Sequence, residues 1–129
     1  MPEPRSDSAA AALIHRGDVF WIAPDAASEP ASAHAHPHVV VQDDVFNRSR
    51  ITTVVVCALT TNLHKASEPG NVLLEPGEGN LPQRSVVVVS QISSVEKSCL
   101  GERIGSLASE RVDQVVAGLR FQQASFFER

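Results

Sequence analysis

Aromatic side chains are scarce in this sequence, which has five Phe, one Trp and no Tyr among 129 residues. With so few rings the core must be packed mainly by aliphatic side chains, and valine runs such as Val86–Val89 supply them. Valine is β-branched and fits the pleated surface of a sheet better than the interior of a helix. The composition therefore predicts a mainly β protein.

Cysteine is also rare, and long apolar runs are missing. Cys57 and Cys99 have no metal-binding or redox spacing around them. No stretch approaches the roughly 20 apolar residues that a membrane helix needs, and the first residues lack the apolar segment of a secretory leader. We therefore expect a cytoplasmic protein with two reduced thiols and no membrane partner.

Positive charge is not in excess. The formal net charge is -4 and the pI is about 5.7, which argues against broad electrostatic binding to nucleic acid. A chain of this length with 43% hydrophobic and 20% charged residues is typical of one globular domain. If RNA is a ligand, it must be bound in a local groove.

Apolar runs bounded by turn residues predict a series of short strands. The expected strands are 17–23, 38–42, 51–59, 71–74 and 85–92. In the segment 51–59 both the even-numbered and the odd-numbered positions are mostly apolar, so this strand should be covered on both faces and lie centrally. In the first strand, Phe20 and Trp21 point to opposite faces, and we assign both to the core rather than to base stacking.

One helix is predicted, over residues 106–121. Apolar side chains recur with helical spacing from Val112 to Leu119 and form a single stripe. Ser106 or Ser109 is the expected cap. The opposite side, which includes Arg111, should face water.

The remaining segments are expected to be irregular. Residues 1–13, rich in Pro, Ser and Ala, predict a disordered arm before a domain at 14–129. The segment 24–37 is long for a loop and indicates a flexible flap. Residues 43–50 form a polar connection, and the glycines of 101–105 predict a break in the chain.

Five segments, in this order, carry a resemblance to a known family. They are R-G-D-V-F-W at 16–21, P-H-V-V-V-Q-D-D-V-F-N-R at 37–48, A-L-T-T-N-L at 58–63, L-P-Q-R-S-V-V-V-V-S-Q-I at 81–92 and S-V-E-K-S-C-L-G-E-R-I-G-S-L at 94–107. The chain resembles the MazF/PemK-type toxins of toxin–antitoxin systems, which are small endoribonucleases. The resemblance implies an SH3-like small barrel of the MazF/PemK/CcdB type with a C-terminal helix, usually a homodimer. Its implied partners are single-stranded RNA and an acidic antitoxin, with no cofactor.

The implied reaction sets the residue types to look for. RNA supplies its own nucleophile, the ribose 2′-hydroxyl, so the enzyme needs a base, an acid and a donor to the phosphorane charge. The resembled family uses an Arg before the Pro that opens the second strand and a Thr that ends the third. Thr60 matches the Thr, whereas His36 stands in place of the Arg. Because an imidazole can act as acid or base near neutrality, we predict His36 and Thr60 as catalytic residues.

Further side chains are expected to contact RNA. These predicted contacts are Glu29, Thr61, Asn62, His64, Lys65, Arg84 and Gln91. Arg84 precedes a strand, where its charge could meet a phosphate or an acidic segment of the antitoxin. His34, His36 and His38 alternate and would share one side of an extended chain, but no further ligand is paired with them, and we predict no metal.

Two functions of different class stay open. The first is a metal-independent, sequence-specific endoribonuclease that cleaves single-stranded mRNA and is silenced by a cognate antitoxin. The second is a catalytically inactive binding protein on the same fold, or a gyrase-poison-like toxin of the CcdB type. The missing Arg and the acidic net charge motivate the second.

Overall fold

The computed structural model describes residues 14–23 and 35–124, which form six strands, two α-helices and three short 3-10 helices. In chain order the elements are β1 (Asp18–Ile22), β2 (His36–Val40), α2 (Asp44–Asn47), β3 (Thr53–Thr60), η1 (Leu63–Ser67), β4 (Val72–Leu74), η2 (Glu78–Asn80), β5 (Ser85–Glu96), η3 (Lys97–Cys99), β6 (Leu100–Ser106) and α3 (Ser109–Gln122). The predicted arm at 1–13 and most of the predicted flap lie outside the described residues.

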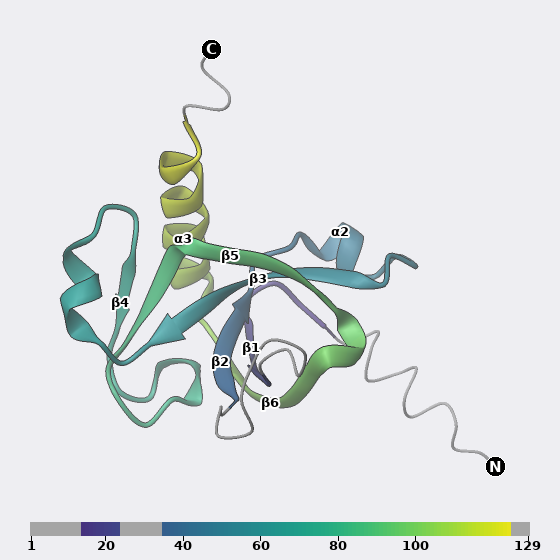
Figure 1. Cartoon of the computed structure of the whole chain (residues 1–129), viewed down its shortest axis with the longest axis horizontal. Helices are drawn as coiled ribbons and strands as arrows, with labels where there is room; N and C mark the ends of the chain where they lie inside the picture. Colours follow the sequence, from purple (N-terminus) through teal and green to yellow (C-terminus); the bar gives the residue numbers. More distant parts are fainter. Residues whose placement is uncertain (1–13, 24–34, 125–129) are drawn as a thin grey trace.

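The strands form one antiparallel sheet in the order β4-β5-β3-β2-β1-β6. The sheet is strongly curled: the long β5 arches across it and leads through η3 into β6, which returns beside β1 (Figure 1). β3 lies inside the sheet between β2 and β5. The prediction of a central strand, and of a mainly β fold with a C-terminal helix, is therefore confirmed.

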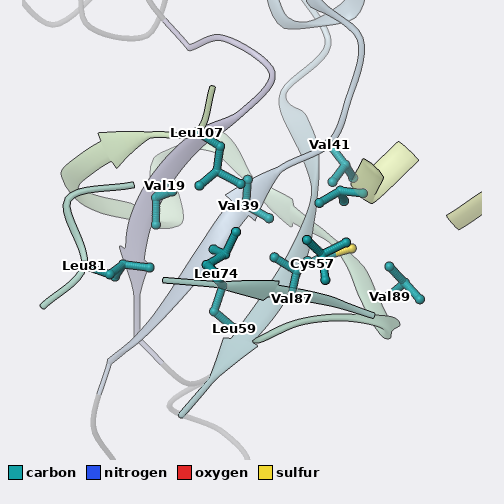
Figure 2. Close-up of a cluster of buried hydrophobic side chains, with 12 residues drawn as sticks. Val19, Val39, Val41, Cys57, Leu59, Leu74, Leu81, Val87, Val89 and Leu107 are labelled. Atoms are coloured by element: carbon teal, nitrogen blue, oxygen red, sulfur yellow. The ribbon is translucent and has the colours of Figure 1, made fainter. Parts of the chain in front are cut away.

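Alternation along the strands divides the buried side chains between two cores. Odd-numbered side chains such as Val39, Cys57 and Val87 pack together in one core (Figure 2). The helix α3 covers this face of the sheet and contributes Val115. Full burial of each such aliphatic side chain contributes about 1.5–3 kcal/mol to the stability of the fold. The apolar stripe predicted for the helix therefore supplies one side of this core.

The second core lies on the other face of the sheet and is made of even-numbered side chains. They include Phe20, Val40 and Val56, with Leu100 of β6 packed against them. The placement of Phe20 in the core is confirmed. The same prediction for Trp21 is wrong, because its side chain is 40% exposed. Trp21 shares its face with Val19 but lies two residues further along β1, beyond the reach of the core.

The break predicted at the glycines of 101–105 is wrong, because these glycines lie within β6. There they permit close backbone approach. A Cβ atom on Gly101 would stand 2.7 Å from the carbonyl oxygen of Trp21, and one on Gly105 would stand 2.5 Å from that of Gly79. Glycine is therefore required in this strand by the chain packed beside it.

Two helix starts also differ from expectation. The polar connection at 43–50 contains α2, which begins where the Asp43 side chain accepts a hydrogen bond of 2.8 Å from the backbone N–H of Val45. That N-cap is visible in the sequence. For α3 the predicted serine caps are wrong, since Ala108 occupies the N-cap position without a side-chain bond and Ser109 already lies inside the helix.

Candidate active site

The two predicted catalytic residues lie at neighbouring ends of β2 and β3. The ladder between these strands pairs His38 with Ala58 and Val40 with Val56. The pairing ends at His38↔Ala58, so His36 and Thr60 each lie two residues beyond the last pair. Residues two apart on a strand share a face, so His36, His38 and Thr60 lie on one side of the sheet.

The turn after β3 gives Thr60 a defined local geometry. Its Oγ1 accepts a hydrogen bond of 3.1 Å from the backbone N–H of Asn62, so the hydroxyl hydrogen stays available for a second partner. The Asn62 side chain in turn accepts from the backbone N–H of His64 at 3.2 Å and caps η1. Thr60 thus makes the local backbone bond typical of a strand end and still presents a donor.

The two imidazoles of β2 have different surroundings. His36 is exposed at the first position of the strand, whereas His38 is half-buried. The Nδ1 atom of His38 lies 3.0 Å from the backbone carbonyl oxygen of His36. Burial lowers the pKa of the His38 imidazole below its ordinary value, because the charged form loses hydration.

The two predicted cations already have carboxylate partners. The Lys65 ammonium lies 3.1 Å from Glu68, and the Arg84 guanidinium lies 3.0 Å from Glu75. Both pairs are exposed and therefore weak. A phosphate or an acidic protein segment would have to displace these carboxylates in order to bind.

Gln91 lies in a bulge of β5. The pairing of β3 with β5 jumps from Ala58↔Val88 to Cys57↔Ile92, so residues 89–91 are looped out beside Ala58, two residues from Thr60. Thr61 and Asn62 are exposed just past Thr60. Arg84 precedes the start of β5, which is paired with the end of β3 through Thr60↔Val86. Glu29 lies outside the described residues.

His38 is the side chain that the sequence reasoning placed only in a hypothetical metal half-site. Within residues 14–23 and 35–124 no group of three His, Cys, Asp or Glu side chains is placed to hold a metal ion, and His34 lies outside these ranges. The alternation of His36 and His38 was the signal that both belong to one face. What it did not reveal was the partial burial that distinguishes them.

No helix in the described part of the chain is both long and apolar enough to cross a membrane.

Solved structures of bacterial toxins share this arrangement of strands and helix. The fold matches that of a mycobacterial endoribonuclease in complex with its cognate antitoxin, with a TM-score of 0.69 at 21% identity, covering 87% of this chain and 96% of that one. It also matches the Mycobacterium tuberculosis toxin MazF-mt6, with a TM-score of 0.65 at 20% identity, covering 81% and 93% of the two chains. These likenesses show that the chain has the fold of the MazF-type toxins.

The sequence narrows this class to a family. Residues 15–122 match the PemK-like, MazF-like toxins of type II toxin–antitoxin systems, and the chain belongs to this family. Endoribonuclease MazF2 of Mycobacterium bovis is 36% identical over 110 residues, which cover 84% of this chain and 95% of the relative. Endoribonuclease EndoA of Bacillus subtilis is 30% identical over 114 residues, which cover 87% and 96%.

Proposed function

We propose that this chain is the toxin of a type II toxin–antitoxin pair and acts in the cytoplasm as an endoribonuclease on single-stranded mRNA. Family membership supports this activity, and two relatives at 30% identity or more carry the name endoribonuclease. The observation that supports the assignment of the site is that His36 and Thr60 lie at neighbouring ends of β2 and β3, each two residues beyond the last pair of the ladder between these strands. A homodimer silenced by an acidic antitoxin completes the proposal.

The proposed reaction is an internal transesterification. The ribose 2′-oxygen attacks the adjacent phosphorus, the bond from phosphorus to the 5′-oxygen breaks, and the products are a 2′,3′-cyclic phosphate and a 5′-hydroxyl. His36 transfers a proton during this exchange, and the Thr60 hydroxyl donates a hydrogen bond to a non-bridging phosphate oxygen, where charge develops. Protein side chains supply the proton transfer and the hydrogen bond that the reaction needs, and we propose that it is independent of metal.

The surrounding side chains have proposed roles in binding RNA. Asn62 and Gln91 offer amide groups to base edges, which sequence-specific proteins read in single-stranded RNA. Lys65 and Arg84 would contact phosphates after their carboxylate partners are displaced. Arg84 is also the proposed meeting point for an acidic segment of the antitoxin.

The alternative function, an inactive binding protein or a gyrase poison on the same fold, is not favoured by these comparisons, since the relatives are named for RNA cleavage. The reason for considering an inactive protein was that His36 replaces the expected Arg. In the proposal His36, at the strand end next to that of Thr60, supplies a group able to transfer protons in place of this Arg.

The deciding experiment is RNA cleavage in the presence of EDTA. Purified protein is incubated with a long RNA of mixed sequence, and the cut ends are mapped by primer extension. We expect discrete cuts, and His36→Ala and Thr60→Ala should each slow cleavage about 100-fold or more, the usual scale for proton-transfer groups. Thr53→Ala is the matched control, because Thr53 is an equally half-buried threonine at the opposite end of β3.

The outcomes separate the hypotheses. Thermal unfolding of each variant must match that of the unsubstituted protein before the rates are compared. No cutting at any protein concentration would overturn the proposed enzyme and favour the binding protein. Cutting that survives both substitutions unchanged would leave the activity standing but show that these residues do not carry it.

A further inference from the structure

Two histidines, rather than one, stand on the face of the sheet where RNA cleavage is proposed. His36 and His38 are two residues apart on β2, so their side chains leave the strand on the same side. At a rise of about 3.3 Å per residue their Cα atoms are about 6.6 Å apart. A phosphodiester lying between two rings at this spacing can contact both of them.

We infer that His38 is the general base that accepts the 2′-hydroxyl proton, and that His36 is the general acid that protonates the 5′-oxygen. The inference rests on the proposed function and divides between two side chains the proton transfers that this function requires. The family pattern had directed attention only to the residue before Pro37. His38, the residue after it, has the geometry of the base.

A hydrogen bond sets the tautomer of His38. Its Nδ1 atom lies 3.0 Å from the carbonyl oxygen of His36, and a carbonyl oxygen only accepts. Nδ1 therefore carries the hydrogen, and in the neutral ring the lone pair is on Nε2. The backbone of His36 thus holds the His38 ring with one nitrogen prepared to accept a proton.

The neighbours of His38 favour its neutral form. The positions paired with it are Phe20 on β1 and Ala58 on β3, which are apolar. One strand beyond Phe20, Arg103 of β6 is paired with that residue, and its guanidinium lies 3.4 Å from the carboxylate of Asp18. On β2 itself, His36 disfavours a second positive charge.

These surroundings lower the pKa of the His38 imidazole, chiefly through burial. The ring is therefore unprotonated over a wider range of pH than an exposed histidine, which suits a base. His36 is exposed at the end of the strand, where it can reach a leaving oxygen and exchange protons with water. Burial thus distinguishes the proposed base, His38, from the exposed His36.

The proton balance closes within one turnover. Nε2 of His38 takes the proton of the 2′-hydroxyl as the 2′-oxygen bonds to phosphorus. The bond from phosphorus to the 5′-oxygen breaks, and protonated His36 gives its proton to that oxygen. Thr60, at the neighbouring end of β3, donates to the phosphate during the exchange. Water then removes the proton from His38 and returns one to His36.

The test compares two substitutions by their rates of cleavage as a function of pH. His38→Ala removes the ring and its bond to the His36 carbonyl. His38→Asn removes the base but keeps an amide N–H near the position of Nδ1. If His38 only positions the His36 backbone through this hydrogen bond, the asparagine variant should keep that role. We expect both variants to cleave at least about 100-fold more slowly at neutral pH, and added imidazole to restore part of the rate of the alanine variant.

The pH profile gives a readout that a structural role would not change. The unsubstituted protein should lose activity as acid protonates His38, with a midpoint below about 6.5, the ordinary histidine value. Both variants should lack this acidic limb. Binding of an RNA with a 2′-deoxy nucleotide at the cut site should be unchanged, which controls for folding and affinity.

Nitrogen NMR of the unsubstituted protein keeps the inference testable if the variants fail to fold. The neutral His38 ring should show hydrogen on Nδ1 and should titrate at the midpoint of the acidic limb. Full activity in His38→Asn, or hydrogen on Nε2 in the neutral ring, would overturn the inference while the proposed function stood. An absence of any cleavage by the unsubstituted protein would overturn both.

Discussion

At the scale of single residues, Glu78 and Arg111 join a turn of the sheet to the helix. The Arg111 guanidinium donates to both carboxylate oxygens of Glu78, each over 2.9 Å, and both side chains are only 27% exposed. The expectation that Arg111 simply faces water is therefore wrong. Its hydrogen bonds to Glu78 are the main reason that the pKa of this carboxyl is lowered.

Replacing Glu78 should reveal how much this pair contributes to the free energy of unfolding and how that contribution depends on pH. The pKa of the Glu78 carboxyl is lower in the folded protein than its ordinary value of 4.5, so the ionised group stabilises the fold at a pH above 4.5. This contribution disappears as the pH falls and the group is protonated. Glu78→Gln should lower the free energy of unfolding by about 1 kcal/mol at neutral pH.

Urea unfolding at neutral pH and again in acid measures the effect. The difference between Glu78→Gln and the unsubstituted protein should shrink in acid. Glu68→Gln, in the exposed pair with Lys65, is the control and should change stability by less than about 0.5 kcal/mol. An equal loss of stability at both values of pH would contradict the role assigned to the pair.

At the scale of elements, one close contact sets how α3 lies against the sheet. The backbone carbonyl of Gly70, in the turn before β4, meets α3 at Gly118, where a Cβ atom would collide with it. Gly118 is buried inside the helix, where glycine costs about 1 kcal/mol relative to alanine. Close packing of the helix on the turn explains glycine at this position.

Gly118→Ala should therefore destabilise the protein even though alanine favours helices. The added methyl group meets backbone, which cannot rotate away, and such overpacking costs about 1–3 kcal/mol or more. We expect a net loss of about 1–2 kcal/mol after the gain in helix propensity is subtracted. Thermal or urea unfolding measures it, with Asp113→Ala on the exposed side of α3 as the control. A variant more stable than the unsubstituted protein would show that the contact relaxes freely.

At the scale of the whole molecule, the net charge of -4 limits how RNA is held. Lys65 and Arg84 are the lysine and arginine side chains among the proposed contacts, and both are paired with carboxylates. The logarithm of the affinity for single-stranded RNA falls linearly with the logarithm of the salt concentration. The slope is about −0.7 for each phosphate that the protein neutralises. Two such contacts give a slope of about −1.4 for each site.

This slope is measured by titrating a non-cleavable RNA at several salt concentrations. Arg84→Ala should reduce its magnitude by about 0.7, whereas Arg120→Ala, on the last turn of α3, should leave it unchanged. A slope steeper than about −4 would indicate that a broad electrostatic surface binds the RNA instead of a local groove.

Much of the fold could be predicted because the strands are marked by their own side chains. Apolar residues on both parities of β3 indicated its central place, and the helical stripe around Val115 located α3. The errors arose where a residue depends on a distant neighbour. Trp21 is exposed because the core ends before it, and position 105 of β6 requires glycine because Gly79 packs against it.

The sequence by itself determined the composition of the core, the acidic net charge, five of the six strands and the presence of His36 and Thr60, since these depend on residue type and local spacing. Only the tertiary structure decided that the strand ends carrying those two residues are neighbours, because strand pairing joins segments far apart in the chain. It also decided that His38 is half-buried, since burial depends on strands and side chains brought together from elsewhere in the chain.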